Sequence, residues 1–324
     1  MSDNSYAYAS GRVSGLEESL LTDRTWNQLI SAEDRDEVLR ILGDSWYGSL
    51  LQKEETLEGA LRSAVCYAEE ELAELSNDKN FTRGILLRRD VRNARYLWKN
   101  LASGGDGDVD LEPAGMIPLE DLQRVWGDSN IVDVLPIQFQ ETLEEIQSLH
   151  SPTAAKLDSV LDRLAAQIES ENLGKLDEPV GSLPSVKIEL KNFLTAARCR
   201  GNEFSPAAIE EIMLDGGYHT PSDIAEAVRI NKLAPLLGEK SDFEEAALAL
   251  DKGLESGSFL AFQRVSDQMT LDVLERASGN MFSPGPLAAY VLRRELEASH
   301  LKMIAAGKAV GIDPRRLSAR VPRG

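Results

Sequence analysis

Apolar residues recur every three or four positions along nearly the whole chain, which is the spacing of one helix face. Between residues 55 and 75 this stripe consists of Leu57, Leu61, Ala64, Val65, Ala68, Leu72 and Leu75. A second stripe, between residues 153 and 173, consists of Leu157, Val160, Leu161, Leu164, Ile168 and Leu173. Convincing alternating strands are missing, and aromatic residues, which strands favour, are only 6% of the chain. The sequence therefore predicts an all-α fold with helices of very unequal length.

A short helix pattern occurs three times along the chain, which indicates internal repetition. Its starting residues are Asp34, Pro118 and Thr220, and the acids three positions later are Glu37, Asp121 and Asp223. Asp34 and Thr220 suit an N-cap, and an acid three residues on completes a capping-box-like start. Pro221 suits the first helical position. A truncated fourth copy runs from Asp313 to Leu317.

Each copy follows a longer helix that carries a polar residue and, in most cases, a basic residue two positions later. The pairs are Ser10 and Arg12, Asn93 and Arg95, Asn192 and the exception Leu194, and His300 and Lys302. The polar residues lie 83, 99 and 108 positions apart. We therefore expect three units, residues 1–78, 79–178 and 179–282, closed off by residues 283–324.

Charge narrows the choice of partners. The chain has 35 basic and 54 acidic side chains, for a formal charge of −19. Nucleic acid and anionic lipid both require a basic surface, so neither is expected as the main partner. Residues 283–324 carry eight basic and three acidic side chains, a net of +5, so the remainder carries −24. The two biases predict separate surfaces.

The sequence also predicts a soluble protein in a reducing compartment. Two cysteines, Cys66 and Cys199, are too few for a disulfide scaffold. The first residues have neither a basic n-region nor an apolar h-region, and no stretch approaches 18 apolar residues. Any membrane association is expected to pass through another protein.

Motifs of common active sites are absent from the sequence. There is no phosphate-binding G-x-x-x-x-G-K-[ST] loop, no G-x-S-x-G elbow and no zinc spacing among the three histidines and two cysteines. The segment Asp106 to Glu112 resembles a calcium loop but has Leu111 and Ile117 where an EF-hand requires Gly and Glu. Glu69, Glu70 and Glu71 are expected on a solvated helix face. We expect no cofactor, no metal and no catalysis.

Four segments resemble the C subunit of V/A-type rotary ATPases, the counterpart of the d subunit in eukaryotic V-ATPases. They are Tyr8 to Leu21, Asp90 to Lys99, Ile188 to Arg198 and Phe282 to Gly311. The similarity is collinear over a single region, residues 5–322. The family often has Asn where this chain has Ser10 and His300.

The resemblance implies a funnel-shaped protein of three pseudo-symmetric helical repeats that acts as a socket in a rotor. Such a protein lies at the cytoplasmic face of the membrane on the proteolipid ring and receives the central stalk, the D and F subunits. It links ATP hydrolysis or synthesis to transport of protons or sodium without catalysing either, and no homo-oligomer is expected. A helical-repeat adaptor unrelated to ATPases is the alternative, although a repeat of about 100 residues is long for a solenoid.

Candidate partner-contacting residues occupy matched places in the predicted units. They are Arg12, Asn93, Arg95, Lys99, Asn192, Arg198, His300 and Lys302. Two interpretations apply: the side chains cap neighbouring helices and tie unit to unit, or some of them line the funnel and touch the stalk.

Overall fold

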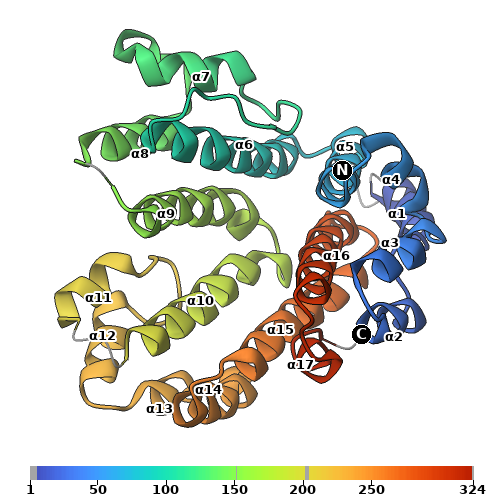
Figure 1. The fold of residues 1–324 in the computed structure, drawn as a ribbon. Coiled ribbons are helices and arrows are strands. Elements are labelled where there is room, and N and C mark those ends of the chain that lie inside the picture. Colours follow the sequence, from blue (N-terminus) through green and yellow to red (C-terminus); the bar gives the residue numbers. More distant parts are fainter. Residues whose placement is uncertain (1–5, 151, 201–203, 323–324) are drawn as a thin grey trace.

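The computed structural model describes residues 6–150, 152–200 and 204–322, which form helices and no β-strand (Figure 1). The predicted all-α fold is confirmed. Residues 1–5 of the first expected unit and residues 323–324 of the closing segment lie outside the described residues. Short 3₁₀ helices are η1 (Ser129–Val134), η2 (Leu173–Lys175), η3 (Val180–Ser182) and η4 (Ser241–Phe243).

The α-helices vary from 5 to 25 residues in length. The first nine are α1 (Ala7–Glu17), α2 (Asp23–Ser31), α3 (Arg35–Gly43), α4 (Gly48–Glu54), α5 (Leu57–Leu75), α6 (Lys79–Ala102), α7 (Leu119–Gly127), α8 (Ile137–Ser148) and α9 (Ala154–Asn172). The others are α10 (Leu183–Cys199), α11 (Pro206–Ile212), α12 (Pro221–Arg229), α13 (Leu233–Leu237), α14 (Glu244–Ser256), α15 (Leu260–Ser278), α16 (Gly285–Ala309) and α17 (Pro314–Ser318).

Side-chain caps set many of the helix starts. An oxygen of the N-cap side chain accepts a backbone N–H from the first turn at Thr22, Asp34, Thr56, Asp78, Thr153, Ser205, Thr220 and Asp313. This confirms the predicted caps at Asp34 and Thr220. Thr220 and Asp223 form a full capping box, with Pro221 at the start of α12. Each such cap satisfies an N–H that has no partner within the helix.

Six long helices form a closed circuit of packed neighbours (Figure 1). In chain order α5, α6, α9, α10, α15 and α16 each pack against the next, and α16 packs against α5. The short helices lie outside this circuit: α2 to α4 beside α5 and α16, α7 and α8 beside α6 and α9, and α11 to α14 beside α10 and α15.

Three of the apolar clusters each combine short helices with long ones. One holds Trp98, Leu122, Phe139 and Leu161 of α6 to α9, and another holds Phe193, Ile224, Leu250 and Phe262 of α10 to α15. A third joins Leu29, Val38 and Leu61 of α2, α3 and α5 to Leu301 and Ile304 of α16. Helix α16 thus supplies part of the core around α2, α3 and α5. The division into three units stays a prediction.

A buried latch on α6 fastens the loop that leads to α7. The amide of Asn93 bonds both the backbone C=O and the backbone N–H of Glu112, at 3.2 and 2.9 Å. One turn earlier, the carboxyl group of Asp90 accepts the N–H groups of Gly115, Met116 and Ile117. The loop comes so close that a Cβ at Gly115 would lie 2.2 Å from the Leu86 oxygen.

The latch on α10 has the same design. Asn192 bonds the C=O and N–H of Leu214, both at 2.8 Å, and Glu189 accepts the N–H groups of Tyr218 and His219 just before α12. On α16, Glu297 accepts the N–H of Leu21, just before α2. The contact of Glu297 lies at the start of α2, as the contacts of Asp90 and Glu189 lie at the starts of α7 and α12.

Candidate functional site

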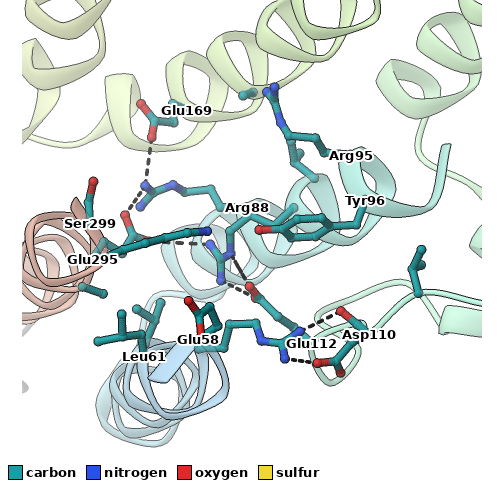
Figure 2. A pocket seen from close by; sticks show the side chains of 18 residues that line it. Glu58, Leu61, Arg88, Arg95, Tyr96, Asp110, Glu112, Glu169, Glu295 and Ser299 are labelled. Atoms are coloured by element: carbon teal, nitrogen blue, oxygen red, sulfur yellow. Dashed lines mark hydrogen bonds and ion pairs between the residues drawn. The ribbon is translucent and has the colours of Figure 1, made fainter. Parts of the chain in front are cut away.

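The main candidate site is a cavity of about 810 Å³ among α5, α6, α9 and α16 (Figure 2). Its apolar wall includes Leu61, Val65, Val91, Val109, Ala165 and Ala298. Its charged lining has five cations and five acids: Arg62, Arg88, Arg92, Arg95 and Lys302 against Glu58, Asp110, Glu112, Glu169 and Glu295. The cavity is electrically balanced despite the strongly acidic chain.

Helix α6 contributes its basic residues because of their spacing. Arg88, Arg92 and Arg95 follow at intervals of four and three, which places their side chains on one helix face. The aromatic ring of Tyr96 also lines the cavity, with 46% of its surface exposed (Figure 2). This arginine row therefore defines one wall of the site.

Arg88 bridges three helices of the circuit. Its guanidinium lies 3.0 Å from Glu169 on α9 and 2.5 Å from Glu295 on α16 (Figure 2). Lys187 on α10 also pairs with Glu169, at 2.8 Å. Burial would raise the pKa of Glu169, but Lys187 and Arg88 outweigh it and lower the pKa to about 2. Glu169 therefore stays ionised and holds α6, α9 and α10 together.

Arg92 forms a second bridge, toward α5 and the loop after α6. It lies 2.8 Å from both Glu69 and Glu112. Arg89 reaches the other oxygen of Glu69 at 2.7 Å. Burial opposes ionisation of Arg92, but the surrounding carboxylates hold its pKa well above the ordinary value. Buried pairs of this kind fix geometry, since removing either partner leaves an uncompensated charge.

The sequence expectation for Glu69 was wrong. Instead of lying on a solvated face, its side chain is fully buried between two arginines. Helical periodicity alone could not show this, because the covering residues come from α6. The acidic segment after α6 is likewise partly structural, since Asp110 pairs with Arg62 and Glu112 is buried against Arg92.

Among the predicted contact residues, only Arg95 and Lys302 line the central cavity. Arg95 pairs with Asp158 and Asp162 of α9 at 3.1 and 2.8 Å, and Lys99 pairs with Asp158 at 2.7 Å. Lys302 is exposed and has no ion pair among the described residues.

The remaining predicted contact residues lie elsewhere. Asn93 and Asn192 are buried in the latches. Arg12 pairs with Glu71 at 3.3 Å, and His300 is buried beside Asp267 at 2.8 Å. Arg198 lines a second pocket, at the end of α10.

The basic C-terminal segment is used largely inside the molecule. Arg293 pairs with Glu17, Arg294 is buried against Glu297, and Arg320 pairs with Asp267. Lys308 donates a hydrogen bond to the Ala32 carbonyl. Arg293 and Lys308 thus fasten α16 to the N-terminal helices, and Arg320 ties the segment after α17 to α15, roles that the charge of the segment alone did not reveal.

The described side chains of the site are suited to binding a partner and to holding the helices in place, and they include no activated nucleophile. Burial raises the pKa of the Cys66 thiol to about 12, so it is not an activated nucleophile. Within the described parts of the chain, no cluster of His, Cys, Asp and Glu is suited to a metal ion. Nor does any helix there combine the length and apolar character needed to cross a bilayer.

Comparison with known proteins places the chain among ATP synthase subunits. It is 23% identical to the C subunit of the A-type ATP synthase of Methanocaldococcus jannaschii, over 96% of this chain and 85% of that protein. The corresponding protein of Desulfurococcus sp. is 25% identical, over 96% and 89% of the two chains. That of Halorubrum lacusprofundi is 22% identical, over 97% and 96%. The sequence profile of the ATP synthase (C/AC39) subunit matches residues 9–320.

This match spans nearly the whole chain and confirms the resemblance drawn from the sequence, so the adaptor unrelated to ATPases is excluded. The chain therefore belongs to the ATP synthase (C/AC39) subunit family, which is structural rather than catalytic.

Proposed function

We propose that this protein is the rotor socket that couples the central stalk, the D and F subunits, to the proteolipid ring. In this role it sits at the cytoplasmic face as a peripheral part of the complex, and its rotation links ATP hydrolysis or synthesis to proton or sodium transport. Two observations support this proposal. Family membership makes the chain a subunit of an ATP synthase complex, and its long helices form a closed circuit around a cavity lined by ion pairs.

The circuit suits torque transmission because it resists deformation. Packed helices have low compressibility, and a closed ring of contacts has no free edge at which to shear. The bridges of Arg88 and Arg92 span joints of α6 with α5, α9 and α16, where a sliding helix would separate buried charges. A load applied at one helix is therefore passed to the others.

The end of the stalk is the proposed occupant of the central cavity. The apolar wall and the exposed ring of Tyr96 would cover apolar side chains, while Lys302 and Arg95 lie where they would meet acidic ones.

Co-purification with the D and F subunits and with the proteolipid ring tests this proposal. Lys302→Glu should weaken stalk capture by about tenfold, the effect of replacing one charged contact by a repulsive one, with little change in melting temperature. Arg315→Glu, another exposed basic residue, is the matched control. Failure of the unaltered chain to bind stalk or ring contradicts the socket role, whereas equal capture by both variants contradicts only the assigned cavity.

Arg95→Glu and Arg198→Glu separate the two interpretations of the predicted contact residues. Arg95 is tied to two carboxylates, so its reversal should also lower the melting temperature. If binding falls only in proportion to stability, the residue ties helices together. A loss of binding at unchanged stability assigns it to the interface.

A further inference from the structure

A second pocket, of about 570 Å³, lies away from the central cavity where α10, the turn from α14 to α15, and α17 meet. Three arginines line it: Arg198 and Arg200 at the end of α10, and Arg316 on α17. Its other polar lining residues include Ser258 and Gln263. No carboxylate is among the described lining residues.

This pocket differs in charge from the central cavity, in which every arginine is paired with an acid. Arg200 and Arg316 are exposed, and neither has an ion-pair partner within the described chain. Arg198 does make an interaction within the protein. In a chain with 54 acidic side chains, a described lining that has three guanidiniums and no acid is an exceptional local environment.

We propose that this arginine pocket binds a phosphate-bearing small anion. The planar guanidinium presents paired N–H donors that match phosphate oxygens, and such charge-assisted bonds are the stronger ones. The Ser258 hydroxyl and the Gln263 amide have no side-chain partner among the described residues and add neutral donors. The pocket is larger than a single phosphate, and Phe259, Leu254 and Leu260 give it an apolar wall against which an organic part of the ligand packs.

Binding here is local rather than steered from a distance. The net charge of −19 repels anions at long range, but this repulsion is screened beyond about 8 Å at physiological salt. Contact with exposed arginines is itself screened, so affinity falls as salt rises. The proposal is independent of the socket role, because it concerns a different pocket.

Titration calorimetry of the full chain with pyrophosphate and with ATP, at fixed ionic strength, tests the proposal. Arg200→Gln and Arg316→Gln should each weaken binding by about tenfold, the loss of one charge-assisted contact. Arg315→Gln is the matched control, because Arg315 neighbours Arg316, is exposed and does not line the pocket. Equal melting temperatures of all variants exclude a folding defect.

Each outcome decides the matter. Saturable binding that both pocket variants weaken and the control does not supports the site. Tighter binding of ATP than of pyrophosphate then assigns the apolar wall to the organic part, and equal binding assigns recognition to phosphate alone. No saturable binding of either probe, or equal weakening by Arg315→Gln, overturns the proposal.

Discussion

The latches on α6 and α10 solve one structural problem with different chemistry. Both use a buried asparagine to hold the backbone of a loop and an acid three residues earlier to hold the start of a short helix. On α6 the acid is Asp90, which accepts three backbone N–H groups. On α10 it is Glu189, which accepts two and also contacts the ring of His219. The buried asparagines fix the position of each loop. The acids and the glycines near them differ between the two latches, so we expect the latches to respond differently to pH and to added side-chain atoms.

Removing the asparagines should produce the largest effect. Asn93→Ala and Asn192→Ala each leave a buried N–H and C=O without partners, a cost of about 3–4 kcal/mol in the free energy of unfolding. Denaturant unfolding measures both, with the exposed Asn80→Ala as a control expected to change stability by less than about 0.5 kcal/mol. Unequal losses at positions 93 and 192 would show that the two latches are not equivalent.

The pH dependence of stability should distinguish the α6 latch from the α10 latch. Burial raises the pKa of Asp90 to about 6, against the opposing effect of its backbone donors. The folded state therefore binds a proton more tightly than the unfolded one, so Asp90's contribution is fully present below pH 4 and is lost as the pH rises toward 6. The change amounts to about 3 kcal/mol.

The difference in unfolding free energy between the unaltered protein and Asp90→Asn, followed from pH 4 to pH 7, isolates this contribution. Other carboxylates cancel in the difference, including Glu169, whose lowered pKa acts in the opposite direction. A difference that does not vary with pH would disprove the assignment to Asp90.

Glycine substitution should separate the two loops by how closely they approach their helices. A Cβ at Gly115 would lie 2.2 Å from the backbone oxygen of Leu86, which cannot move away freely. A Cβ at Gly217 would meet the end of the Glu189 side chain at 2.7 Å. Gly115→Ala should therefore lower the melting temperature by an amount that corresponds to about 2 kcal/mol, and Gly217→Ala by less than half of that. The reverse order would contradict the close approach at α6.

The smallest expected difference in stability comes from the first residues of α7 and α12. Thr220 caps α12 with a full capping box, whereas α7 begins at Pro118 with no side-chain cap. Thr220→Ala should cost about 1 kcal/mol, and Pro118→Ala should change stability little. Thermal unfolding of the two variants tests whether local capping or the latch sets the position of each short helix.

Much of the fold could be predicted from the sequence because local rules determine it. Stripe periodicity located α5 and α9, and capping chemistry located the starts of α3 and α12. The recurrent Asn93 and Asn192 were also found, as polar residues at matched positions. The acids three residues earlier, Asp90 and Glu189, lie in segments that resemble the family, but the sequence assigned them no role, because an acid on a helix is usually solvated. The same three-residue spacing at Glu297 and His300 is a signal that could have found them.

The central cavity could not be predicted, because its walls come from α5, α6, α9 and α16, far apart in the chain. Arg95 and Lys302 were chosen for their repeat positions, whereas Arg88 and Arg92, which bridge the helices, were not. Burial of Glu69 depended on those same long-range contacts. Spacing along one helix shows which residues share a face but not what covers that face.

The packing of α16 into the N-terminal core has a consequence for synthesis on the ribosome. Leu301 and Ile304 fill the same cluster as Leu29 and Val38, and the Lys308 ammonium reaches the Ala32 carbonyl. Helices α2, α3 and α5 cannot complete this cluster until α16 has left the exit tunnel. The helices from α6 to α15 can pack earlier, because their partners are nearer in sequence. Packing of α16 against α2, α3 and α5 thus follows the packing of the helices between them. A chain that ends before α16 leaves this cluster incomplete.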